Sequence, residues 1–169
     1  MPAGGTGLVL RGLRKEPATI GKWHLGWDLT YKEGKAKTVD NIDFTKRVAN
    51  GPTDRGFDYF YGLTSPSGPP HLYMVNDMAE KQPNTRFEES GGGLYKIKGG
   101  IGHSDWSADG MQPHLADKML EYLDENKDSD KPFFLYMALT APHIPLFPSK
   151  EFKGKSKIGD YGDLVMMID

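Results

Sequence analysis

The sequence predicts an α/β fold with a mostly parallel central sheet flanked by helices, and three segments support this class. Residues 133–139 form a nearly unbroken apolar run, which is typical of a strand covered on both faces in a parallel sheet. A segment of helical pattern, residues 111–123, precedes this run. A short apolar stretch ending at Ile20 indicates another strand. A helix followed by a buried strand is half of a βαβ crossover, so the carboxyl ends of these strands should share one edge.

The first element expected along the chain is the end of a helix over residues 8–16, which Pro17 would stop. The stretch Gly21-Lys22-Trp23-His24-Leu25-Gly26 then follows the predicted strand. Side chains alternate along a strand, so Lys22 and His24 should point one way and Trp23 the other. An ammonium beside an imidazole suits a substrate with several anionic oxygens. The simpler alternative is a lysine on a solvated strand edge beside a histidine satisfied in the core.

The middle of the chain alternates between loops and short strands. Residues 28–55 are predicted to be a polar surface loop, and residues 56–63 a strand. In that strand Phe60 should face away from the other aromatic side chains. Residues 64–70 are too rich in proline, glycine and serine to form a helix and are expected to be a rigid loop. Residues 72–75 form a further candidate strand.

A glycine-rich segment, residues 83–110, precedes the helical pattern and is expected to carry a hairpin around residues 94–97. In the helix, Leu115, Met119 and Tyr122 follow the i, i+4, i+7 spacing of a buried stripe. Neighbouring apolar positions should widen that stripe, and these are Ala116, Leu120 and Leu123.

His143 is the candidate acid–base residue after the last strand. It lies between Pro142 and the Ile144-Pro145 pair, which reduces the conformational freedom lost on positioning the imidazole. A histidine alone in a loop is more often structural or solvated than catalytic. However, ligands of open α/β sheets bind beyond the carboxyl ends of strands, where His143 and Lys22 both lie.

Composition narrows the possible partners. The 169 residues include 21 basic and 23 acidic side chains, a formal net charge of -2, which gives no indication of nucleic acid or an anionic membrane as partner. The chain has no cysteine, and therefore no disulfide, thiolate metal site or cysteine nucleophile. No apolar run approaches the roughly 20 residues that cross a bilayer. The apolar residues 8–10 are too few for a secretory signal, and the compartment is left open.

Four motifs occur in an order that resembles the sulfatases, the arylsulfatase A-like branch of the alkaline-phosphatase-like hydrolases. They are Gly-Lys-Trp-His-Leu-Gly at 21–26, Gly-Phe-Asp-Tyr-Phe-Tyr-Gly-Leu at 56–63, Lys-Pro-Phe-Phe-Leu-Tyr at 131–136 running on to Ala-Pro-His-Ile-Pro at 141–145, and Gly-Asp-Tyr-Gly-Asp at 159–163. The resemblance implies a partial sulfatase domain over residues 1–169. Within it, residues 1–18 would be a divergent or truncated N-terminus, residues 83–110 a variable insertion, and the C-terminal part would be missing.

The resemblance also implies roles for individual residues. Lys22 and His24 would hold the sulfate oxygens and the hydroxyls of the nucleophile, and His143 would protonate the departing alcohol oxygen. Ser65 would help to bind the ester, with Ser67 as the alternative. The substrate would be a small sulfate ester or a sulfated glycan. Family members are expected in periplasmic, secreted or lysosomal compartments.

The residues that the family needs for its nucleophile and metal are absent from this sequence. Sulfatases oxidise a cysteine or serine in a Cys/Ser-x-Pro-x-Arg segment to formylglycine, and they bind Ca²⁺ through an Asp-Asp pair and an Asp-Asn pair. This sequence has no Cys/Ser-x-Pro-x-Arg segment and no Asp-Asp pair, and it ends before the position at which the family's downstream Asp-Asn pair is expected. The sequence therefore predicts a fragment of a sulfate-ester hydrolase that is inactive alone. The alternatives are a non-catalytic remnant that binds an anion, and a phosphate-ester hydrolase, which the Lys-x-His pair disfavours.

No metal ligands are predicted. A cluster of His103, Asp105 and Asp109 is conceivable, but these residues fit a solvated polar loop better. The acidic residues near the C-terminal end are interpreted as the start and solvent face of a helix. These are Asp160, Asp163 and Asp169.

Overall fold

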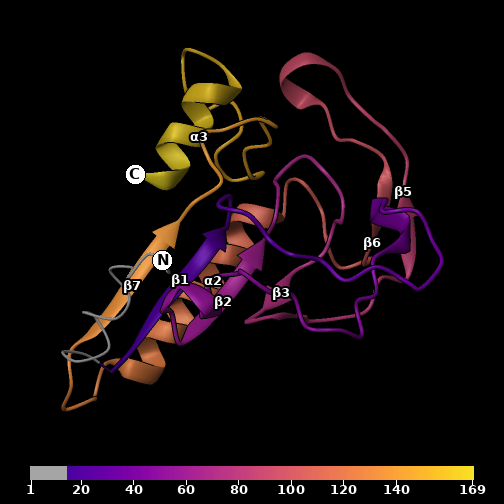
Figure 1. Cartoon of the computed structure of the whole chain (residues 1–169). Helices are drawn as coiled ribbons and strands as arrows, with labels where there is room; N and C mark the ends of the chain where they lie inside the picture. The colour runs from indigo at the N-terminus through magenta and orange to yellow at the C-terminus, as the bar shows by residue number, and fades with distance from the viewer. Residues whose placement is uncertain (1–14) are drawn as a thin grey trace.

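The structure is a computed structural model that describes residues 15–169. Its centre is a mixed five-stranded sheet with the strand order β4-β3-β2-β1-β7 (Figure 1). The strands are β1 Lys15–Lys22, β2 Tyr59–Leu63, β3 Met74–Val75, β4 Met78–Ala79 and β7 Phe133–Ala138, with β5 Thr85–Phe87 and β6 Gly100–Gly102 forming a separate pair. The helices are α2 Met111–Asn126 and α3 Asp160–Ile168, with the short 3-10 helices η1 Val39–Asn41, η2 Thr53–Arg55 and η3 Gly93–Tyr95. β1 runs parallel to both β2 and β7, whereas β3 and β4 are antiparallel. The expected α/β class with a central sheet flanked by helices is confirmed.

Each face of the sheet carries its own core, because successive strand residues alternate between faces. On one face Ile20, Tyr61 and Leu63 pack with the buried side of α2. On the other face Phe60 and Trp23 pack with side chains of the segment that follows β1. The predicted loop over residues 28–55 has little regular structure, as expected, but it covers that second face.

The start of β1 differs from the predicted helix end. Lys15, Glu16 and Pro17 belong to the strand, and residues 8–14 lie outside the described part of the chain. Pro17 has no N–H to donate, and the β1–β7 register shifts between Lys15 and Ala18. Proline is tolerated in a strand at such an irregularity.

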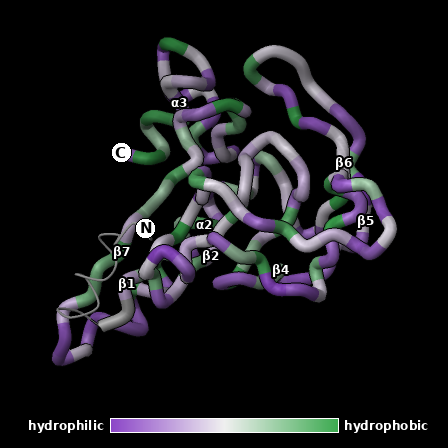
Figure 2. Tube along the Cα trace, viewed as in Figure 1, coloured by the Kyte–Doolittle hydropathy of each residue, from purple (hydrophilic) through white to green (hydrophobic). Residues whose placement is uncertain are grey.

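The predicted double coverage of residues 133–139 is wrong for the carboxyl half of β7. Tyr136 and Met137 are 51% and 53% exposed, and they lie on opposite faces. Within residues 15–169, β7 pairs only with β1, so it is an edge strand. Figure 2 shows a hydrophilic loop between α2 and β7, followed by the more hydrophobic residues of β7.

The helical stripe is narrower than expected. Leu115, Met119 and Tyr122 are buried as predicted, but Leu120 is exposed. Phe57 also departs from the predicted alternation: it packs against Trp23, with ring centroids 6.2 Å apart, instead of sharing the face of Tyr61. Phe57 precedes β2, and the left-handed backbone of Gly56 breaks the strand pattern before it.

The glycine-rich segment forms a longer hairpin than the one expected around residues 94–97. β5 and β6 pair in antiparallel fashion, a bridge between Ser90 and Ile97 extends the pairing, and η3 lies beyond it. Ile97 and Trp106 are buried in the same core as α2. This segment is therefore packed into the domain.

The interpretation of Asp163 as a solvent-facing residue is wrong. Its side chain is fully buried in α3 and accepts hydrogen bonds from the backbone N–H groups of Gly154 and Ser156, both at 2.6 Å. These bonds stabilise the carboxylate and lower the pKa of Asp163. The sequence of this short helix does not determine whether Asp163 faces solvent or the interior. The side chain faces the interior because the loop before α3 supplies the N–H groups that bond it.

Replacement of Gly21 by alanine should destabilise the protein strongly. Gly21 has φ 127°, and a Cβ there would lie 2.0 Å from the Ala138 carbonyl oxygen. Backbone strain and overpacking together should cost about 2–5 kcal/mol in the free energy of unfolding. Gly26→Ala is the matched control, because Gly26 has φ 98° but no atom within 4 Å of the added carbon. Urea unfolding should show the larger loss for Gly21→Ala, and equal losses would contradict the packing argument.

His71 should make stability depend on pH. Its Nε2 lies 2.7 Å from the Lys98 carbonyl oxygen and must donate, while its buried Nδ1 has no hydrogen-bond partner among residues 15–169. Burial lowers the pKa of His71, so the stabilisation is present above the unfolded value near 6.5 and is lost as pH falls through the folded pKa.

Thermal unfolding between pH 7.5 and 5.5 should reveal this loss, at most about 1.4 kcal/mol per pH unit for one group. His71→Phe should flatten the pH dependence. Phe87→Leu alters a ring that contacts His71 at 5.1 Å but keeps the imidazole, and should retain it. A His71→Phe profile parallel to that of the unchanged chain would refute the assignment.

Candidate functional site

Three adjacent parallel strands end at one edge of the sheet, and the predicted site residues follow those ends. Lys22 is the last residue of β1 and pairs in register with Leu63 at the end of β2. Gly21 pairs with Ala138 at the end of β7. Ser65 comes two residues after β2, and His143 lies on the loop after β7. The chain thus brings the segments of Lys22, His24, Ser65 and His143 to the same carboxyl edge.

Lys22 is a partly buried cation at this edge. Burial lowers the pKa of its ammonium group, because the charged form loses hydration. In the described chain no carboxylate forms an ion pair with Lys22. A partly desolvated cation without an acidic partner favours an anionic ligand.

Trp23 anchors the residues on either side of it. Its ring is buried in the core opposite α2, and its Nε1–H donates to the Gly26 carbonyl at 3.0 Å. Its backbone N–H donates to the Leu63 carbonyl at 3.1 Å, which continues the pairing with β2 past Lys22. His24 follows as an exposed residue. The buried aromatic therefore turns the backbone so that Lys22 and His24 stay at the edge.

The ring of His143 has a defined tautomer. Its Nδ1 lies 2.6 Å from the Ile144 carbonyl oxygen, which can only accept, so Nδ1 carries a hydrogen. Nε2 is then the nitrogen available to a ligand, as an acceptor in the neutral ring and as a donor in the imidazolium. The side chain is exposed, so a substrate can reach it.

A buried hydrogen bond from α2 holds the loop that carries His143. Gln112 Nε2 donates to Thr140 Oγ at 2.5 Å, and both residues are buried. The Thr140 carbonyl accepts the backbone N–H of His143 at 3.1 Å. On the far side of the loop, Ala141 and Leu146 pack with Leu164 of α3. The sequence reasoning missed Gln112, although it lies three residues before Leu115, on the buried stripe.

The Ser65 hydroxyl organises its own loop. Its oxygen accepts hydrogen bonds from the backbone N–H groups of Gly68, at 3.1 Å, and Ser67, at 3.4 Å. Its proton is not committed to any acceptor among the described residues. Ser65 and Ser67 are both half-buried, so the geometry keeps both as candidates for a ligand contact.

A metal centre is not supported by the described part of the chain. Residues 15–169 contain no group of three His, Cys, Asp or Glu side chains that could hold a metal ion. His103 and Asp105 contact each other, but the Asp105 carboxylate is paired with Lys81. The residues present therefore do not fit the calcium ion that the family resemblance implies. In the same range no helix is long and apolar enough to cross a membrane.

Comparison with known proteins places these features in a family. The family model described as Sulfatase matches residues 9–169. The chain is 29% identical over 150 residues to N-acetylgalactosamine-6-sulfatase of Canis lupus familiaris, covering 89% of this chain and 24% of that protein. It is 26% identical over 182 residues to N-acetylgalactosamine-6-O-sulfatase of Bacteroides thetaiotaomicron, covering 89% of this chain and 34% of that protein. The chain thus spans about a quarter of the length of the first relative and about a third of the second.

Solved structures agree on the fold. A Bacteroides thetaiotaomicron protein, studied in work on the metabolism of multiple glycosaminoglycans, superposes with a TM-score of 0.68 at 20% identity, over 96% of this chain and 38% of that one. The PsFucS1 sulfatase of Pseudoalteromonas sp. superposes with a TM-score of 0.57 at 19% identity, over 94% of this chain and 31% of that one. The fold is that of the alkaline-phosphatase-like hydrolases, and the chain belongs to the sulfatase family.

The Gln112–Thr140 bond should control the opening of the His143 loop. Thr140→Val removes the hydroxyl and leaves the buried Gln112 amide unpaired, a loss of about 1–3 kcal/mol. Amide hydrogen exchange at His143 should then accelerate by about tenfold or more. Thr140→Ser keeps the hydroxyl and should leave that exchange rate nearly unchanged. Equal exchange in the two variants would show that this bond does not hold the loop.

Proposed function

We propose that this chain supplies the part of a sulfate-ester hydrolase site that holds the sulfate group and protonates the leaving oxygen. The observation that carries the proposal is the meeting of three parallel strand ends, where Lys22, which has no acidic partner among residues 15–169, lies on the strand next to the one that leads to His143. The N-terminus of α2 lies near the same edge, since Gln112 in its first turn bonds Thr140. Its partial positive charge also favours an anion.

Each residue has a role that matches its chemistry. Lys22 and His24 donate charge-assisted hydrogen bonds to sulfate oxygens, and these bonds strengthen as negative charge develops during transfer. His143, with Nδ1–H committed to the Ile144 carbonyl, uses Nε2 to give a proton to the departing alcohol oxygen. Ser65 contributes a hydroxyl to the bound ester. The natural substrate is a sulfated sugar, consistent with the names of the N-acetylgalactosamine-6-sulfatase relatives.

The same proposal holds that these 169 residues bind the sulfate group but do not hydrolyse the ester. They contain neither a cysteine nor a Ser-x-Pro-x-Arg segment from which formylglycine could be made. Proton donation by His143 alone would contribute about 10²–10⁴-fold. Enzymes typically reach accelerations of about 10⁶-fold or more, so positioning and protonation are insufficient.

The binding step can be measured with inorganic sulfate. Backbone amide signals around Lys22 and His143 should shift on titration with sulfate, and Lys22→Ala should weaken binding by about tenfold through the loss of a charge-assisted bond. Lys127→Ala is the control, because Lys127 pairs with Asp124 near the opposite end of α2. Inorganic phosphate tests the rival phosphate-ester function. Tighter binding of phosphate, or an equal effect of both substitutions, would count against the proposal.

The purified chain should not hydrolyse an aryl sulfate in the presence of Ca²⁺. The reason is chemical, because no side chain in the sequence matches the formylglycine precursor motif. Release of a chromogenic phenol over hours, compared with a buffer blank, is the measurement. Turnover that disappears in Lys22→Ala or His143→Ala would contradict this expectation and would reveal an unrecognised nucleophile.

A further inference from the structure

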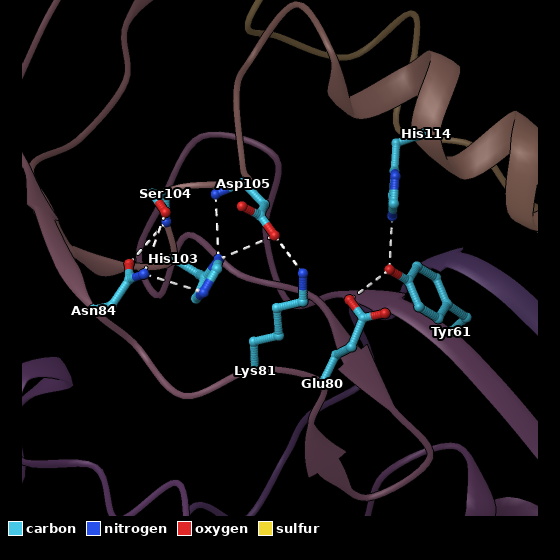
Figure 3. A network of polar contacts seen from close by, with 8 residues as sticks. All are labelled: Tyr61, Glu80, Lys81, Asn84, His103, Ser104, Asp105 and His114. Atoms are coloured by element: carbon cyan, nitrogen blue, oxygen red, sulfur yellow. Dashed lines mark hydrogen bonds and ion pairs between the residues drawn. The ribbon is translucent and has the colours of Figure 1, made fainter.

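The first turn of α2 lies across the carboxyl end of β1. His114 Nε2 is 2.7 Å from the hydroxyl of Tyr61 in β2, as Figure 3 shows. Two residues earlier in the helix, Gln112 Nε2 donates to Thr140 Oγ, just beyond β7. In the sheet β1 lies between β2 and β7. A turn that is bonded to β2 on one side and to the exit of β7 on the other therefore passes over β1.

The side chain of Lys22 belongs on the α2 face of the sheet. Lys22 pairs in register with Leu63, and Leu63 is buried in the core that includes α2. Residues paired in parallel strands point to the same face. The next residue, Trp23, packs in the core on the opposite face, as alternation along a strand requires. Lys22 is therefore directed toward the turn that carries Gln112.

One half of the Gln112 amide has no partner. The residue is 6% exposed, and its Nε2 donates to Thr140 Oγ at 2.5 Å. Its Oε1 is buried as well, and no residue among 15–169 donates a hydrogen bond to it. A buried acceptor without a donor is costly, so such groups are normally bonded in folded proteins. The position therefore requires a donor that can reach Oε1.

Lys22 is the donor that fits this requirement. Its ammonium has three N–H groups, and it takes part in no ion pair within the described chain. Burial lowers the pKa of Lys22, because the charged form loses hydration. A neutral amide oxygen would replace part of that hydration and leave the positive charge available to an anion. A carboxylate in the same place would neutralise the charge.

We propose that Gln112 is a positioning residue that joins Lys22 to the His143 loop. Its Nε2 holds Thr140, whose carbonyl accepts the His143 backbone N–H at 3.1 Å, and its Oε1 accepts one N–H of Lys22. The other two N–H groups of the ammonium remain for sulfate oxygens. The inference rests on the proposed function, because it concerns how the same site fixes its cation relative to its proton donor.

The test follows the titration of the Lys22 side chain in the 169-residue chain, by NMR of the lysine Cε and Nζ signals. Lys22→Arg identifies the signal that belongs to Lys22. Gln112→Leu removes the acceptor, so the pKa of Lys22 should fall, whereas Gln112→Glu supplies a carboxylate, so this pKa should rise. Thr140→Val is the matched control: it breaks the loop bond but keeps Oε1, and the Lys22 titration should not move.

Sulfate affinity is the second measurement. Gln112→Leu should weaken sulfate binding by about tenfold, because Lys22 loses its fixed position. Gln112→Glu should weaken it at least as much, because the carboxylate competes with sulfate for the ammonium. Gln112→Glu keeps the shape of the native side chain, and circular dichroism should show an unchanged fold. If Gln112→Leu does not fold, the direction of the Lys22 shift in Gln112→Glu decides alone.

The outcomes separate this inference from the proposed function. An unchanged Lys22 titration in both Gln112 variants overturns the inference and assigns a water or another hydroxyl to Oε1. A shift in Thr140→Val as large as that in Gln112→Leu also overturns it, because the loop would then set the surroundings of Lys22. If sulfate does not bind the unchanged chain while the Gln112 variants still shift Lys22, the proposed function fails and the link between Gln112 and Lys22 stands.

Discussion

The close parallel contact between β1 and its two neighbours is the constraint on which the rest of the structure depends. The backbone passes so near at Gly21 and Gly62 that neither position has room for a side chain: a Cβ on Gly62 would lie 1.7 Å from the Gly21 carbonyl oxygen. This contact sets the register of the strand ends. Lys22 therefore emerges beside Leu63 and just past Ala138, and the loops that follow must begin at one edge.

Buried polar bonds convert that strand arrangement into a defined loop structure. Gln112 of α2 reaches Thr140, and Asp163 of α3 binds the backbone of the loop that precedes it. Both are buried polar groups, whose cost is offset only when they are hydrogen-bonded. These bonds fix the position of each helix relative to its loop, because they form in only one packing of helix against loop. The His143 segment is thus held from both sides, by α2 and by the apolar contacts of α3.

The glycine-rich segment is anchored in the core at two points. It returns to the core through Ile97 and Trp106, and between these anchors it delivers His103 and Asp105 to the side of α2. The first turn of α2 supports the His143 loop, and His114 of the same helix lines a cavity together with His103.

The sequence by itself determined the elements whose signal is local. The apolar run ending β7, the stripe of Leu115 and Met119, and the four ordered motifs identified an α/β sulfatase-family chain and pointed to Lys22 and His143. Only the tertiary structure decided what depends on distant neighbours. Asp163 faces the interior because backbone N–H groups of the preceding loop bond its carboxylate. Tyr136 is exposed because β7 is the edge strand of the described sheet. The pairing of Tyr61 with His114, 53 residues apart, left no local pattern to read.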